Sequence, residues 1–342
     1  HERFGKLPFA DLLAPAIEVA ERGYAVPVVI QQKWRNAASL PELTTQPGFA
    51  EAFMQGPGWG GREPQVGERF TFAAAARSLR LIAETKGEAF YRGEIAAAAA
   101  SHARAHGGAM TADFAAYQPE WVEPIGRDYR GYRLHEIPPN GQGIAALIAL
   151  GILEKFDLAS LPVDGVASQH LQIEAMKLAF ADVYKYVAEP RAMRLTPAQM
   201  LDDAYLARRA RLIDPKRAQD FGPGHAPQGG TVYLTAADES GMMVSFIQSN
   251  YMGFGSGIVV PGYGLSLQNR GHGFTLDESS DNLVGPGKRP FQTIIPAFLT
   301  KGGKPVMSYG VMGGDMQPQG HMQTLVRMLD YHQQPQAACD AP

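Results

Sequence analysis

Apolar residues recur at intervals of three and four over residues 168–187, the clearest such pattern in the chain. An α-helix turns once every 3.6 residues, so this spacing collects the apolar side chains on one face. We therefore predict a helix over Ser168–Val187 with that face in the core. The face consists of Ile173, Met176, Phe180, Val183 and Val187.

Terminal signals and alanine-rich runs predict further helices. Pro15 stands near the start of one segment and Gly23 at its end, the positions that these residues favour in helices. Thr196, Pro197 and Gln199 combine an N-cap, a first-turn proline and a capping-box glutamine. The expected helices cover residues 14–23, 72–84, 93–106, a stretch after 143, and 196–213.

Alternating apolar and polar residues predict strands, most of them in the last third of the chain. Residues 232–237 and 243–249 flank a short polar turn and predict a β-hairpin. Residues 293–300 and 306–311 predict a second hairpin around a glycine turn. One further strand is predicted over Tyr129–Ile137.

Residues 214–230 separate the two kinds of pattern. They contain three prolines and four glycines and show no apolar periodicity. Such a composition predicts an exposed, mobile connection. The chain therefore divides into a mainly helical part, residues 1–230, and a β-rich part, residues 231–342.

Composition excludes several classes of function. The 342 residues are 45% hydrophobic, which is enough for a large core. With 31 basic and 34 acidic residues the formal charge is −3, so bulk charge gives no reason to expect nucleic acid or an anionic membrane as partner. No apolar run is long enough for a membrane span, and the first residues show no signal-peptide pattern. The compartment stays open between cytoplasm and periplasm.

Local motifs indicate no metal or cofactor. The glycines of residues 56–61 have dinucleotide-loop spacing, but no strand leads into them. His102 and His106 share a helix face without the glutamate that a zinc hydrolase motif needs. The residues around Ser256 do not form the Gly-x-Ser-x-Gly motif of serine hydrolases. Cys339 is the only cysteine, so no disulfide can form within the chain.

The candidate for chemistry is the Gly-Gly-Thr junction at residues 229–231. A threonine at the first position of a strand, after a flexible segment, suits self-cleavage of the Gly230–Thr231 bond. Cleavage would give Thr231 a free α-amine beside its hydroxyl, and that amine could act as general base. These residues alone also fit a hairpin that happens to begin with threonine.

Several short segments add to this junction. They are residues 12–17, 90–93, 129–132, 138–143, 170–182, 254–257, 286–290 and 313–314. In their order and spacing they resemble the γ-glutamyltransferase family of N-terminal nucleophile hydrolases, over nearly the whole chain. The resemblance implies an α+β fold of four layers, αββα, and a precursor that cleaves itself after Gly230. Residues 1–230 would then belong to the large subunit and 231–342 to the small subunit of one intertwined domain. Family members extend before residue 1 and past residue 342, so both parts are expected to be incomplete.

The resemblance also implies the catalytic residues. Thr231 matches the nucleophile, and Ser249 matches the second hydroxyl residue that hydrogen-bonds it. Gly313 and Gly314 match the glycine pair whose backbone N–H groups form the oxyanion hole. Two adjacent glycines can turn both amides toward the point where negative charge develops in acyl transfer.

The substrate-binding positions implied by the resemblance depart from the family pattern. They are Asn250, Tyr251, Arg270, Gln292 and Thr293. The acidic pair that holds the substrate ammonium is replaced by Arg-Gly-His-Gly at residues 270–273, and a serine pair is replaced by Gln292-Thr293. Tyr251 stands where an asparagine is usual. A substrate carboxylate could accept a two-pronged hydrogen bond from Arg270, whereas an ammonium would lose its counter-ion. The alternative is that Arg270 points to solvent or pairs with a structural carboxylate.

We expect an enzyme that forms an acyl-enzyme on Thr231 and passes a γ-glutamyl or related acyl group to water or an amine, as in glutathione metabolism. The alternatives are a glutaryl- or cephalosporin-type acylase of the same fold and a catalytically silent relative with a binding role. No cofactor is expected. The expected partners are a small-molecule amide substrate and the paired large and small subunits, with a dimer of such pairs as a further alternative.

Overall fold

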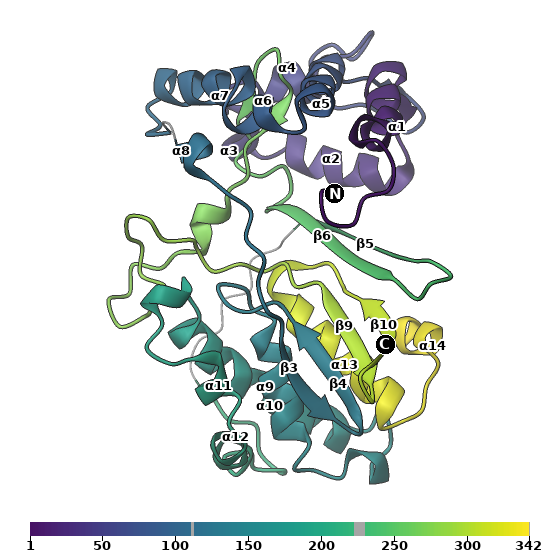
Figure 1. Cartoon of the computed structure of the whole chain (residues 1–342), viewed down its shortest axis with the longest axis vertical. Coiled ribbons are helices and arrows are strands. Elements are labelled where there is room, and N and C mark those ends of the chain that lie inside the picture. Colours follow the sequence, from purple (N-terminus) through teal and green to yellow (C-terminus); the bar gives the residue numbers. More distant parts are fainter. Residues whose placement is uncertain (111–112, 222–229, 342) are drawn as a thin grey trace. The chain divides into compact units, whose positions relative to one another are not determined.

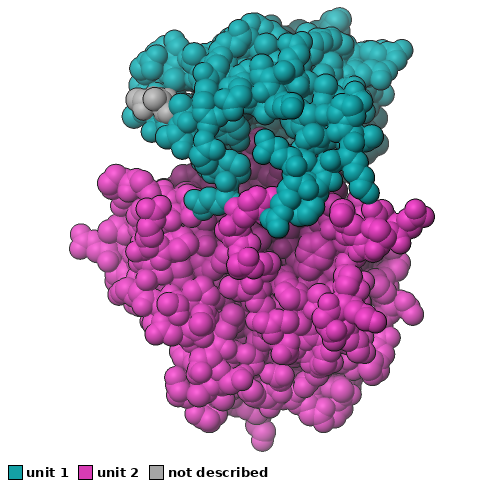
Figure 2. Space-filling model, viewed as in Figure 1, with its two compact units in different colours: residues 1–120, 253–269 teal, residues 121–252, 270–342 magenta. Residues whose placement is uncertain are grey.

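The computed structural model contains two compact units (Figure 2). Each unit has its own apolar core. The described residues are 1–110, 113–221 and 230–341. Unit 1 comprises residues 1–120 and 253–269. Unit 2 comprises residues 121–252 and 270–342.

Unit 1 is mainly helical. Its core is aromatic, and the rings of Trp34, Phe53 and Phe254 lie with centroids 4.8–5.9 Å apart. Its elements are α1 (Phe9–Arg22), β1 (Tyr24–Ala25), α2 (Val28–Ala38), α3 (Pro41–Thr44), α4 (Phe49–Phe53), β2 (Arg69–Phe70), α5 (Ala73–Thr85), α6 (Glu88–Tyr91), α7 (Glu94–Ala105), α8 (Asp113–Ala116), β7 (Val259–Val260) and β8 (Leu265–Ser266).

The structure confirms the two alanine-rich helices as α5 and α7 and changes the first helix. α1 begins at Phe9, so Pro15 lies inside the helix and does not start it. Gly23 follows the last helical residue with φ 75°, the left-handed value that glycine adopts at low cost. The predicted helix end is therefore right and its beginning is wrong.

Unit 2 is built on an antiparallel sheet with strand order β10-β9-β4-β3, accompanied by a β5–β6 hairpin (Figure 1). Its strands are β3 (Ile125–Tyr129), β4 (Tyr132–Glu136), β5 (Gly230–Ala237), β6 (Met243–Tyr251), β9 (Ala297–Lys301) and β10 (Lys304–Tyr309). Its helices are α9 (Ile144–Leu153), η1 (Leu158–Ser160), α10 (Val166–Tyr186), η2 (Pro190–Ala192), α11 (Pro197–Met200), α12 (Asp203–Ala210), η3 (Arg270–Gly273), η4 (Gly314–Met316), α13 (Gln317–Leu329) and α14 (Pro335–Asp340).

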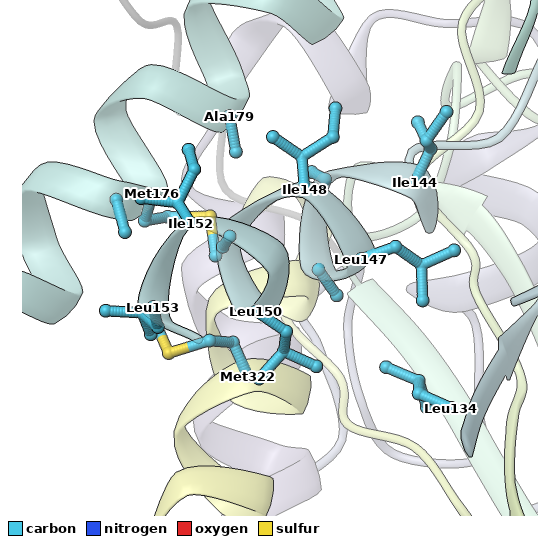
Figure 3. Packing of buried hydrophobic residues seen from close by; sticks show 14 of the residues in the cluster. Leu134, Ile144, Leu147, Ile148, Leu150, Ile152, Leu153, Met176, Ala179 and Met322 are labelled. Atoms are coloured by element: carbon cyan, nitrogen blue, oxygen red, sulfur yellow. The ribbon is translucent and has the colours of Figure 1, made fainter. Parts of the chain in front are cut away.

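Helix α9 forms the centre of the unit 2 core. All of its residues are buried and none has a polar side chain. It packs on β3 and β4 and is covered by α10, α12 and α13. Figure 3 shows the resulting cluster, in which Leu147 and Leu150 of α9 lie with Leu134 of β4 and Met322 of α13.

Both predicted hairpins are present. β5 and β6 confirm the first, and β9 and β10 confirm the second, although residues 293–296 precede the strand. The strand predicted over Tyr129–Ile137 is confirmed as β4, but its beginning is wrong, because Arg130 and Gly131 have positive φ and turn the chain from β3 into β4. Such a tight turn leaves the alternation of apolar and polar residues uninterrupted, so the sequence pattern does not reveal it.

The long helix and the capping box are confirmed with two changes. α10 buries Met176 and Val183 as expected, but Ile173 is 51% exposed. Thr196 and Gln199 form the predicted capping box, yet that helix ends at Met200. Asp202 then caps α12 by accepting a hydrogen bond from the Tyr205 N–H. The helix predicted to run to residue 213 is therefore two helices.

The connection after α12 is irregular over residues 214–221, as predicted. It is nevertheless attached to α10, where Glu174 accepts a hydrogen bond from the Gln219 N–H at 3.1 Å and Lys177 donates to the Gln219 carbonyl. The rest of the predicted mobile connection, residues 222–229, lies outside the described residues.

Replacing Leu147 with alanine should lower the free energy of unfolding of unit 2 by about 2–5 kcal/mol, because a fully buried side chain leaves a cavity between α9 and the sheet. Urea denaturation followed by circular dichroism measures this change. Val166→Ala, at a residue that is 88% exposed, should change it by less than about 0.5 kcal/mol. Equal effects of the two variants would contradict the assignment of the core.

Candidate active site

Thr231 and Ser249 face each other across the β5–β6 hairpin. The register pairs Thr231 with Ser249 and Gly230 with Tyr251, and it is irregular between Gly230 and Thr231. Thr231 Oγ1 donates to Ser249 Oγ across 3.4 Å. Ser249 Oγ also accepts a hydrogen bond from the Tyr251 N–H at 2.8 Å. The hairpin therefore brings these two predicted residues together.

Tyr251 has an uncommon backbone conformation at this point. Its φ is 77°, which costs free energy in a residue with a bulky side chain. The side chain is 4% exposed, and burial raises the pKa of its hydroxyl, as does Asp315, while Arg270 lowers it. Strained residues of this kind concentrate at functional sites, which singles out the end of β6.

Strand β5 runs beside β10 toward the Gly313–Gly314 corner. Two contacts establish this: the Tyr233 ring lies against Gly310, and the Thr235 hydroxyl bonds that of Ser308. Between these two contacts the position moves back by two residues on β5, from Thr235 to Tyr233. It moves forward by two residues on the other segment, from Ser308 to Gly310. The beginning of β5 is therefore directed toward the residues that follow β10 and lead to Gly313.

The Gly313–Gly314 corner has a backbone conformation that favours glycine. Its φ angles are 139° and 61°. The Gly313 carbonyl accepts a hydrogen bond from the Met316 N–H at 3.3 Å, and the Gly314 carbonyl accepts one from Gln142 Nε2 at 2.8 Å. The Gly313 carbonyl shares a peptide plane with the Gly314 N–H, and the Gly314 carbonyl shares one with the Asp315 N–H, so these bonds set the direction of those two N–H groups.

Gln292 and Thr293 form an irregular segment before β9. The Gln292 backbone is bonded to the loop before α9: its N–H donates to Asn140 O, and its carbonyl accepts from the Gln142 N–H, both at 2.9 Å. Thr293 is 1% exposed, and its Oγ1 accepts a hydrogen bond from Arg270 Nη1 at 2.5 Å. Both residues are thus held by backbone and side-chain bonds within unit 2.

Arg270 is buried, although the sequence suggests a residue that meets substrate. Its guanidinium lies 4.6 Å above the Tyr251 ring, and its side chain is 5% exposed. Burial lowers the pKa of Arg270 to about 10, while Tyr251 and Asp315 oppose this shift. Arg270 therefore stays a cation at neutral pH, within reach of the Asp315 charge.

A cavity of about 630 Å³ lies next to Arg270 within unit 2. Tyr251, His272 and Asp315 line it, together with the segment from Phe274 to Asp277. Arg270 is not among its described lining residues, so its charge acts across Tyr251. The volume is in the range of small-molecule sites.

Three residues of unit 2 have no counterpart in the sequence predictions, and two of them, Asn282 and Asp315, line the cavity. The run 270–273 has no acidic residue, but Asp315 supplies a carboxylate to the cavity that this run helps to line. In the sequence, Asp315 directly follows the glycine pair. Asn282 binds the cavity wall, donating to Gly273 O at 2.6 Å and accepting from the Phe291 N–H at 3.1 Å. Gln142 is the third. Its place in the 138–143 loop, which resembled the family, was the only signal in the sequence.

The predicted residues fall into two groups. Thr231, Ser249 and Tyr251 come together on the hairpin. Arg270 and Thr293 form a second, bonded group beside Tyr251. Asn250 lies on β6 between the two and is partly exposed.

Within the described ranges, no three His, Cys, Asp or Glu side chains gather as they would around a metal ion. No described helix has the length and apolar character needed to cross a membrane.

A family model described as gamma-glutamyltranspeptidase matches residues 1–342. The chain is 37% identical over 346 residues to the glutathione hydrolase-like YwrD proenzyme of Bacillus subtilis (strain 168), covering 100% of this chain and 64% of that protein. It is also 37% identical to the oxamate amidohydrolase proenzyme of Klebsiella pneumoniae, covering 94% and 60%.

The structure is similar to the crystal structure of cephalosporin acylase from Bacillus halodurans, with a TM-score of 0.91 and 49% sequence identity. The match covers 100% of this chain and 62% of that one. It confirms the expected α+β class and the αββα fold of N-terminal nucleophile hydrolases. The chain spans about three fifths of the length of these relatives.

Proposed function

Because the chain belongs to the gamma-glutamyltranspeptidase family, we propose that it is an amidohydrolase or acyltransferase with Thr231 as nucleophile. The placement of Thr231 at the start of β5, opposite Ser249, is the observation that supports this. A hydroxyl, a hydrogen-bonding partner for it and a pair of glycine amides are the groups that acyl transfer needs.

Maturation is the first step of this proposal. Thr231 Oγ1 attacks the Gly230 carbonyl carbon, an ester forms, and the C–N bond between the two residues breaks as the nitrogen takes up the proton. Water then hydrolyses the ester. The products are a carboxylate on Gly230 and a free α-amine on Thr231, which can accept the hydroxyl proton in later turnovers.

The two parts of the chain stay together after such a cut. Strand β4, from before the cleavage point, pairs with β9, from after it, through residues 133–135 and 298–300. Helix α9 likewise packs on α13. We therefore assign residues 1–230 and 231–342 to the large and small subunits of one fold. The pair, alone or as a dimer of pairs, is the proposed functional unit.

In the catalytic cycle Thr231 attacks the amide carbonyl of a small molecule, and Ser249 orients its hydroxyl. Negative charge develops on the carbonyl oxygen, where the N–H groups of the Gly313–Gly314 corner stabilise it. The amine leaves, and water or a second amine takes the acyl group from Thr231. No step requires a cofactor or a metal ion.

The substrate class follows from the cavity and from the relatives. Their names describe hydrolysis of glutathione, oxamate and acyl amides. We propose that the cavity beside Tyr251 holds the acyl group, which is γ-glutamyl or a related acid. Asn250 and Gln292 each adjoin a residue with a place in this proposal, since Asn250 precedes Tyr251 and Gln292 precedes Thr293, which is bonded to Arg270. A glutaryl- or cephalosporin-type acylase is the second candidate, favoured by the cation at Arg270 and by His272 on the cavity wall.

The Thr231→Ala variant should remain a single chain, because the attacking hydroxyl is absent. Wild type should release a fragment that begins Thr-Val-Tyr, detected by gel electrophoresis and N-terminal sequencing. Thr235→Ala, on the same strand, is the control and should still be cleaved. A folded wild-type protein that stays intact would favour the catalytically silent relative.

Gly314→Val should lower kcat by roughly 10²-fold or more with a smaller effect on KM, because it misdirects the N–H donors of the corner. Gly302→Val is the matched control, since Gly302 has a similar φ of 56° in the β9–β10 turn with open space around it. It should retain kcat. A change confined to KM in Gly314→Val would show that the corner is not the oxyanion hole.

Release of nitroanilide from glutaryl and γ-glutamyl reporters tests the acyl group. We expect the glutaryl reporter to be preferred in kcat/KM by roughly ten- to a hundredfold, because the nearby Arg270 charge attracts a carboxylate in the cavity and repels an ammonium. Arg270→Gln should remove most of this preference, and Asp315→Asn should increase it, because the two charges oppose each other near the cavity. Arg191→Gln, whose side chain is 87% exposed, is the control. If wild type uses the γ-glutamyl reporter equally well or better, the proposed preference for a glutaryl group is wrong. The pocket then has the usual specificity of the family.

A further inference from the structure

Gln142 joins the two segments that the proposed reaction needs to hold at a fixed spacing. Its side chain is completely buried, and Nε2 donates one hydrogen bond to Thr293 O and one to Gly314 O, both at 2.8 Å. A primary amide has two N–H bonds in fixed directions, so one group sets the separation of both carbonyls. Thr293 is bonded to Arg270, and Gly314 belongs to the proposed oxyanion corner.

The backbone does not provide this link by itself. The loop before α9 is fixed to residues 290–292 through Asn140 and the Gln142 N–H, whatever side chain stands at 142. The Gly314 carbonyl otherwise accepts only the turn bond from the Gln317 N–H among the described bonds. The side chain of Gln142 therefore connects the glycine corner to the rest of the site.

Glycine peptides need such a connection more than others. Without a side chain, Gly313 and Gly314 can rotate over a wide range of φ and ψ at low cost. The Gly314 carbonyl shares its peptide plane with the Asp315 N–H, so holding the carbonyl also holds that N–H and the first turn of η4. The Gly314 N–H, one of the proposed oxyanion donors, belongs to the peptide plane directly before this fixed one, so only the rotations about Gly314 separate the two planes. Small errors in the direction of an oxyanion donor lower catalytic rates without weakening the binding of the ground state.

We propose that Gln142 is a positioning residue for acyl transfer, which sets the spacing between the acyl pocket and the oxyanion corner. This inference rests on the proposed function. It predicts that changes at 142 act on kcat for each active site, whereas a purely structural residue would alter only stability and the yield of mature enzyme.

Gln142→Met keeps the length of the side chain and removes both donors. We expect kcat, normalised to titrated nucleophile, to fall roughly tenfold or more, with KM changed less than about threefold. Gln172→Met is the matched control. Gln172 is equally buried in the same unit, and its Nε2 donates to Ser168 O at 3.3 Å on α10, away from the proposed site. It should lose stability without losing kcat.

Gln142→Glu provides an independent measurement should the methionine variant not fold. Only a protonated carboxyl can donate to Gly314 O, and burial raises the pKa of a glutamic acid. The ratio of variant to wild-type kcat should therefore rise as the pH falls from about 8 to 5. A flat ratio, or a Gln142→Met enzyme with wild-type kcat, would overturn the inference. An inactive wild type would instead overturn the proposed function, so the two failures are distinguishable.

Discussion

Helix α9 is the constraint on which unit 2 depends. A helix without one polar side chain has to be covered on every side, and here β3 and β4 cover one side while α10, α12 and α13 cover the others. Burying its leucine and isoleucine side chains contributes roughly 1.5–3 kcal/mol each. This burial fixes where the segments before α9 and before α13 lie. Both segments enter the candidate site, and the Gln142–Gly314 hydrogen bond joins them.

The site therefore consists of loops that precede packed elements, together with one hairpin end. Helices and strands packed at core density hold their ends within narrow limits, so residues remote in sequence can be brought to one place. Thr231 enters from β5, the glycine corner leads into α13, and Thr293 precedes β9. The sheet joins strands from both sides of the proposed cleavage point. A cut at residue 230 would remove one covalent bond from the fold and leave its core contacts in place.

Charge in this region is balanced between segments that are distant in sequence. Arg270 is buried, stacked on Tyr251 and bonded to Thr293, within reach of the Asp315 charge. A buried guanidinium needs such surroundings, because desolvation without partners would cost several kcal/mol. The sequence correctly indicates that the run 270–273 has no acid. It does not indicate that an acid two residues after Gly313 would line the same cavity.

Local signals were sufficient wherever one segment determines its own structure. The capping box at Thr196 and Gln199, the C-terminal Gly23 and both hairpins follow from interactions within a few residues. The predictions failed where the same pattern of apolar and polar residues permits two conformations. Residues 130–131 turn the chain without breaking the alternation, and Asp202 starts a new helix where the apolar pattern continues.

The family, its order of motifs and the identity of the candidate nucleophile could be inferred from sequence, because they depend on residue type and spacing along the chain. The depth of Arg270, the approach of Asp315 to the cavity and the bonds of Gln142 depended on tertiary structure. These three properties arise between segments that are separated by tens of residues or more. Only the packing of α9, α13 and the sheet specifies which of those segments meet.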